Sequence, residues 1–168
     1  MQARMNHPAM MIPDAMKALQ ALALAVEKTG VPKSTLYLVE LRASQINGCS
    51  VCLDMHARQA RQAGETDERL FAVAAWRDAP YFTDAERAAL AMTEALTRLS
   101  DRSDPLPDDL WNEVARHYDE QALAGLLLAI ATINVWNRLN VSTRQVAGEW
   151  LKSAEARKWV EKNHAIAR

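Results

Sequence analysis

Residues 41–56 read Leu-Arg-Ala-Ser-Gln-Ile-Asn-Gly-Cys-Ser-Val-Cys-Leu-Asp-Met-His, and they predict the end of one helix and the start of another. Apolar side chains before this point recur at helical spacing, and Gly48 can adopt the left-handed conformation that commonly ends a helix. The next helix is expected to begin at Cys49 or Ser50. The segment therefore predicts two helices joined by a very short connection, with both cysteines of the chain at the start of the second helix.

The helical spacing of apolar residues continues on both sides of this segment, and no alternating stretch is flanked by hairpin turns. Pro13 and Gly30 bracket the first predicted helix, and Thr83 with Glu86 predicts a capping box that opens another. The sequence thus predicts an all-α fold, with helices over residues 14–28, 34–47, 49–64, 67–78, 83–100, 108–117 and 120–138 and a helical extension over 150–164.

The size of the chain, 168 residues and 18.8 kDa, suits a single domain over 1–168, with the motif-bearing core over about 36–148. The net charge of -1, from 20 basic and 21 acidic residues, provides no basic stripe and argues against nucleic acid as a partner. Residues 1–13 lack the pattern of a signal peptide, which predicts a cytoplasmic protein.

The longest apolar run, residues 122–135, is interrupted by Gly125, Thr132 and Asn134 and falls short of the ~20 residues that a membrane-spanning helix needs. It predicts a buried helix and no membrane partner. Because residues 122–133 are apolar on nearly all sides, part of this helix is expected to be buried between helices or between subunits of a homo-oligomer.

The chemistry of the chain concentrates in Cys49, Cys52 and His56, which are spaced so that all three fall on one face of a helix. Unpaired amides and the positive dipole end at the helix start favour a thiolate over a thiol. His56, one turn after Cys52, can take the Cys52 proton or pair with its thiolate. The arrangement predicts a two-step peroxidase: Cys52 attacks a hydroperoxide and becomes a sulfenic acid, and Cys49 condenses with it to a disulfide.

Other uses of two cysteines and a histidine are less well supported by the sequence. A zinc site would need a fourth ligand, and the remaining histidines, His7, His117 and His164, show no paired spacing. Covalent haem attachment would need a histidine directly after the second cysteine, where Leu53 stands. Inert burial is a further alternative, because free cysteine packs like a small hydrophobe. The shared helix face favours redox chemistry, with no metal and no cofactor.

Beyond this motif, four stretches extend a resemblance to the AhpD-like alkylhydroperoxidases of the carboxymuconolactone decarboxylase superfamily. They are Gly-Glu-Thr at 64–66, Ala-Ala-Trp-Arg at 74–77, Phe-Thr-Asp-Ala-Glu-Arg-Ala-Ala-Leu at 82–90 and Ile-Asn-Val-Trp-Asn-Arg at 133–138. The resemblance, over about 36–148, implies an all-α fold, assembly into trimers or hexamers, and hydroperoxide reduction by a cysteine pair that an external dithiol or thiol protein regenerates. It also implies that Cys52 attacks, Cys49 resolves and His56 relays the proton.

Two positions depart from the better-studied AhpD proteins, which have a proton-relay glutamate where this chain has Tyr37 and a histidine where it has Val51. Glu40, one helical turn after Tyr37, is a candidate for the role of that glutamate, although a helical glutamate is more commonly a solvated surface residue.

Two rival functions use the same residues differently. A protein disulfide oxidoreductase or redox sensor would apply the thiols to protein partners. A decarboxylase of the superfamily's other branch would work without a cysteine pair, so the presence of Cys49 and Cys52 argues against it.

Overall fold

The computed structural model describes residues 2–152, and within this range every regular element is a helix, which confirms the predicted all-α class. In chain order the α-helices are α1 (Pro8–Met11), α2 (Pro13–Val26), α3 (Lys33–Asn47), α4 (Ser50–Gln62), α5 (Asp67–Ala72), α6 (Asp84–Thr97), α7 (Asp108–Ala115) and α8 (Glu120–Thr143). Short 3-10 helices occur at η1 (Val73–Ala75), η2 (Leu99–Asp101) and η3 (Glu149–Lys152).

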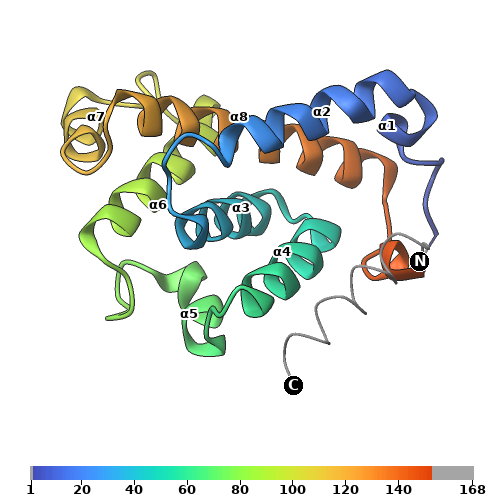
Figure 1. Ribbon diagram of the computed structural model, residues 1–168, viewed down its shortest axis with the longest axis horizontal. Helices are drawn as coiled ribbons and strands as arrows, with labels where there is room; N and C mark the ends of the chain where they lie inside the picture. Colours follow the sequence, from blue (N-terminus) through green and yellow to red (C-terminus); the bar gives the residue numbers. More distant parts are fainter. Residues whose placement is uncertain (1, 153–168) are drawn as a thin grey trace.

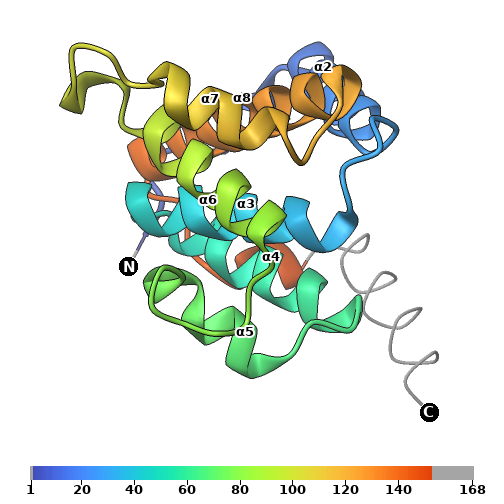
Figure 2. The same cartoon turned by 90° about the vertical axis from the view of Figure 1, so that its left-hand side faces the viewer.

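The central helix is α3, which packs against α4, α6 and α8. In both views of the ribbon, α2, α7 and α8 form the upper tier, α3 and α6 lie beneath them, and α4 and α5 lie lowest (Figures 1 and 2). Because α3 has neighbours on several sides, Leu38, Val39 and Ala43 are fully buried. This helix therefore brings the start of α4 and the second half of α8 to the same end of the core.

The connection between α3 and α4 has the conformation that the sequence predicts. Gly48 follows the last residue of α3 with a left-handed φ of 66°, a conformation that glycine adopts without a steric penalty. Cys49 is extended and serves as the N-cap of α4. The predicted capping box is also present, with Thr83 and Glu86 each bonding the other's backbone amide at the start of α6.

Two predicted helix ends are wrong by five residues or more. The helix expected over 67–78 ends at Ala72 and continues as the 3-10 turn η1, which places Val73 and Trp76 in the core while the Trp76 indole donates to Glu94. The helix expected to end at 138 continues to Thr143, where Arg144 adopts a left-handed conformation. Tertiary packing overrides local sequence preference at both places.

α1 is a helix that the sequence analysis did not predict. Pro8 occupies its first turn, where a missing N–H costs nothing, and His7 Nδ1 accepts the backbone N–H of Ala9 at 3.2 Å. The predicted C-terminal extension over 150–164 lies outside the described residues, except for residues 150–152, which belong to η3.

α8 is the long apolar helix expected from the sequence. By length and composition it could cross a membrane, but 56% of its most apolar stretch is buried in the fold, as in the core helix of a compact domain. Its outer face leaves Leu128 and Val135 exposed, and the adjacent α2 is apolar yet buries only Val26. The fold therefore has an apolar surface across α2 and α8.

Candidate active site

The two cysteines meet at the first turn of α4. Cys49 Sγ lies 2.7 Å from Cys52 Sγ and accepts the backbone N–H of Cys52 at 3.4 Å. Both are free cysteines, with exposed fractions of 1% for Cys49 and 0% for Cys52. Ile133 of α8 and Ala43 of α3 pack around them. The predicted cysteine pair is thus assembled in a buried, mostly apolar site.

The surroundings of the pair favour one negative charge, on Cys49. Hydrogen bonding from the Cys52 thiol lowers the pKa of Cys49 from 9.0 to about 7 against the opposing effect of burial, with help from the Cys52 amide, Asn137 and the charge of His56. The neighbouring Cys49 sulfur and burial raise the pKa of Cys52 well above its ordinary value. These shifts favour a thiolate on Cys49 over one on Cys52.

His56 lies on α4 one turn after Cys52, and the structure brings Glu40 of α3 to it. A carboxylate oxygen of Glu40 is 2.9 Å from His56 Nδ1, although the approach is not aligned as a straight hydrogen bond. Burial of His56 opposes protonation, but the negative charge of Glu40, with that of Cys49, outweighs it and raises the pKa of His56. All four predicted site residues thus lie at one junction of α3 and α4.

Two asparagines of α8 that the sequence did not predict as site residues also act on the thiols. Asn140 Nδ2 lies 3.4 Å from Cys52 Sγ, and hydrogen bonding from Asn137 lowers the pKa of both thiols. The signal that could have found them is the recurrence of asparagine at every third position, 134, 137 and 140, in an otherwise apolar helix.

The positions that depart from the AhpD pattern contribute no comparable group. Tyr37 is partly buried, and this burial raises the pKa of its phenol. Val51 packs as an apolar side chain against the cysteine cluster. The titratable pair that the structure assembles next to the cysteine motif is therefore Glu40 with His56.

Comparisons with known proteins identify the family of this chain. Residues 13–95 match the carboxymuconolactone decarboxylase family. The uncharacterized protein YdfG of Bacillus subtilis is 35% identical over 130 residues, which cover 77% of this chain and 87% of that protein. The chain belongs to the carboxymuconolactone decarboxylase family. The AhpD-like resemblance seen in the sequence is thereby confirmed at the level of the family.

Two solved structures share the fold of this chain. The protein of unknown function ATU0492 from Agrobacterium tumefaciens, a candidate antioxidant defence protein AhpD, has a TM-score of 0.80 and 34% identity, covering 87% of this chain and 98% of its own. The debrominase Bmp8, in complex with 2,3,4-tribromopyrrole, has a TM-score of 0.72 and 21% identity, covering 91% of this chain and 78% of its own. The second likeness shows the fold alone.

One charged cluster in this family member links helices and lies apart from the thiols. The buried Glu94 carboxylate accepts the Trp76 indole N–H at 2.9 Å and pairs with Arg42 and Arg77, each at 2.7 Å. Burial alone would raise the pKa of Glu94, but these donors together lower it. The cluster ties α3, η1 and α6 together and is best understood as a structural feature.

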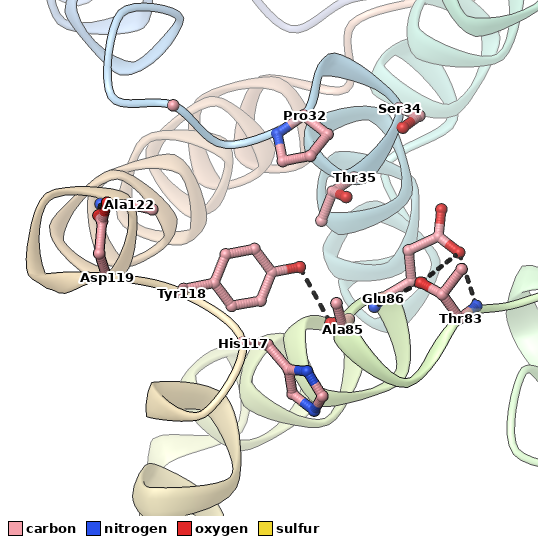
Figure 3. Close-up of a pocket in the computed structure, with 11 residues that line it drawn as sticks. Pro32, Ser34, Thr35, Thr83, Ala85, Glu86, His117, Tyr118, Asp119 and Ala122 are labelled. Atoms are coloured by element: carbon pink, nitrogen blue, oxygen red, sulfur yellow. Dashed lines mark hydrogen bonds between the residues drawn. The ribbon is translucent and has the colours of Figure 1, made fainter.

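A cavity of about 440 Å³ lies at the opposite end of α3 from the cysteines. Figure 3 shows Tyr118 reaching across it to donate its hydroxyl to the Ala85 carbonyl at 3.0 Å, with the capping pair Thr83 and Glu86 beside it. Thr35, at the start of α3, also lines the cavity. Because α3 is 15 residues long, this cavity is separated from the thiols by about 20 Å of helix. It is not the site of the cysteine chemistry.

Proposed function

We propose that this protein is a thiol-dependent hydroperoxide reductase in which Cys49 and Cys52 cycle between dithiol and disulfide. The observation that carries the proposal is the 2.7 Å separation of the two sulfurs at a helix start. Two further features support it. The lowered pKa of Cys49 provides a thiolate near neutral pH, and the pair of His56 and Glu40 provides a proton relay.

The proposed cycle has three steps. A thiolate attacks one peroxide oxygen, the O–O bond breaks, and the alkoxide leaves as an alcohol after taking a proton, so that the attacking sulfur becomes a sulfenic acid. The second thiol then attacks this sulfur, an S–S bond forms, and the hydroxyl leaves with the thiol proton as water. An external dithiol finally reduces the disulfide by exchange and becomes a disulfide itself.

Within this cycle we assign the attack to Cys52 and the resolving step to Cys49. His56 lies one helical turn after Cys52, and Asn140 donates to the Cys52 sulfur. Since the resting charge is favoured on Cys49, the Cys52 proton must first pass to Cys49, 2.7 Å away. Glu40 would stabilise His56 as an imidazolium, which then supplies the proton to the leaving alkoxide.

Burial of the pair favours a small substrate over a protein substrate. With exposed fractions of 1% and 0%, neither sulfur can contact the surface of a folded partner unless the start of α4 opens. A small hydroperoxide also needs an opening to reach these sulfurs, but a much smaller one than a folded protein does. This difference makes hydroperoxide reduction the better proposal and the protein disulfide oxidoreductase or redox sensor the weaker one.

The test is peroxide consumption by the purified protein with several small dithiols and a thiol-protein donor, followed by mass spectrometry of the peptide that contains both cysteines. We expect turnover and a Cys49–Cys52 disulfide as the oxidised product. Oxidation of one equivalent without turnover under every donor would refute the enzyme and favour a sensor. His56→Ala should slow turnover, and His117→Ala, at a histidine away from the pair, is its matched control.

The assignment of roles has its own test in single-cysteine variants treated with peroxide and a dimedone-type trapping reagent. Cys49→Ser should leave a Cys52 sulfenic acid that the reagent labels and that excess peroxide overoxidises. Cys52→Ser should consume no peroxide. Labelling of Cys49 in the Cys52→Ser variant, with none in the converse variant, would reverse the assignment.

A further inference from the structure

The second half of α8 carries three buried asparagines on the side that faces the cysteine pair. Asn134, Asn137 and Asn140 have exposed fractions of 7%, 1% and 8%, although the helix around them is largely apolar. Buried carboxamides need hydrogen-bond partners, because their desolvation is otherwise costly. Three of them in register therefore indicate a polar function on this face of α8.

The hydrogen bonds fix which way the Asn137 amide points. The backbone carbonyl of Ile130 can only accept, so Asn134 turns its Nδ2 toward it at 2.9 Å and its Oδ1 toward Asn47. Asn47 Nδ2 donates to that oxygen at 2.9 Å and also to Asn137 Oδ1 at 2.9 Å. The NH₂ group of Asn137 must then face the other way, where it donates to Ser44 Oγ at 3.0 Å. Asn137 therefore turns its amide donors, and not its oxygen, away from Asn47.

Asn140 makes the more direct contact, with its Nδ2 placed 3.4 Å from Cys52 Sγ. An N–H donor interacts more strongly with a thiolate than with a neutral thiol, so such contacts favour the charged form. In agreement, hydrogen bonding from Asn137 lowers the pKa of Cys49 and Cys52, and hydrogen bonding from Asn140 acts in the same direction on Cys52.

We infer that Asn137 and Asn140 form a pair of amide donors that stabilises the negative charge on the Cys49–Cys52 pair. Asn140 contacts the sulfur that attacks in the proposed reaction and is a catalytic residue of it, so its role in turnover rests on the proposed function. Asn137, one turn earlier on α8, acts less directly on this charge, because its amide group is held between Ser44 and Asn47. Asn47 is a positioning residue, since it acts by orienting Asn137.

The test measures the thiol directly, without peroxide. In a Cys49→Ser background, where Cys52 is the remaining thiol, the rate of alkylation by iodoacetamide is followed against pH. Replacing Asn140 with Leu removes the donor at similar size and should raise the midpoint by about one pH unit, which is about tenfold in thiolate below the midpoint. Thr143→Val is the matched control, because Thr143 is buried one turn further along α8 and donates to the Leu139 carbonyl.

An unchanged midpoint in a folded Asn140→Leu protein would overturn the inference, as would an equal shift in Thr143→Val. If Asn140→Leu does not fold, Asn140→Asp keeps the shape, replaces the donor by a carboxylate and should raise the midpoint at least as much. The two proposals fail separately. If the alkylation midpoint shifts but the protein shows no peroxide turnover, the amide pair is supported and the reductase is refuted. If the protein turns over peroxide but the midpoint does not shift, the reductase is supported and the amide pair is refuted.

Discussion

The coupling between the two thiols gives a quantitative prediction for Cys49. The Cys52 thiol is the largest cause of the lowered pKa of Cys49, which falls from 9.0 to about 7. Such a fall corresponds to about 3 kcal/mol of preferential stabilisation of the thiolate. At pH 7 about half of Cys49 would be thiolate, compared with about 1% for a thiol of ordinary pKa, a difference of about 50-fold.

Cys52→Ala removes the thiol that donates to Cys49, so the pKa of Cys49 should rise toward its ordinary value. The alkylation rate of Cys49 at neutral pH should then fall by a factor approaching about 50. Cys52→Ser is the matched comparison, since the hydroxyl keeps a donor at the same place, and its rate should fall between those of the wild type and the alanine variant. The pH dependence of iodoacetamide alkylation, located by mass spectrometry, measures all three proteins. A Cys49 midpoint that stays near 7 in Cys52→Ala would show that the other neighbours, namely the amide at the helix start, Asn137 and His56, lower the pKa without the Cys52 thiol, and would refute the coupling.

Three other predictions concern the charged relay, the buried carboxylate and the apolar surface. Since Glu40 raises the pKa of His56, the pair stabilises the fold below pH 6.5, and this stabilisation is lost as the pH rises through the folded-state pKa of His56. In an NMR titration of Glu40→Gln, His56 should titrate at lower pH than in the wild type. An unchanged midpoint would contradict the contact. Glu94→Ala should lower the free energy of unfolding, measured by urea denaturation, by about 3–5 kcal/mol. The control Asp14→Ala removes an exposed carboxylate and should change this free energy little. Equal effects of the two substitutions would contradict the structural role of the Glu94 cluster. Light scattering of the wild type should give a mass well above the 18.8 kDa of one chain. Leu24→Glu places a charge on the exposed face of α2 and should lower this mass. A monomer at micromolar concentration would refute the oligomer.

The sequence by itself determined the features that depend on residues close together in the chain. Gly48 ends one helix and Cys49 begins the next because the conformations of a left-handed cap and an N-cap depend on the local backbone. The capping box of Thr83 and Glu86 was predictable for the same reason. The spacing from Cys49 to His56 likewise fixes their common helix face, since helical periodicity requires no information from the rest of the fold.

Only the tertiary structure decided what surrounds the thiols. Glu40 was no more than a candidate until the packing of α3 against α4 placed it beside His56, and Asn140 reaches Cys52 from 88 residues further along the chain. The burial of both sulfurs likewise comes from α8 and α3 closing over them. Such contacts depend on how helix faces pack against one another, and a periodic pattern identifies a buried face without identifying the residues it meets.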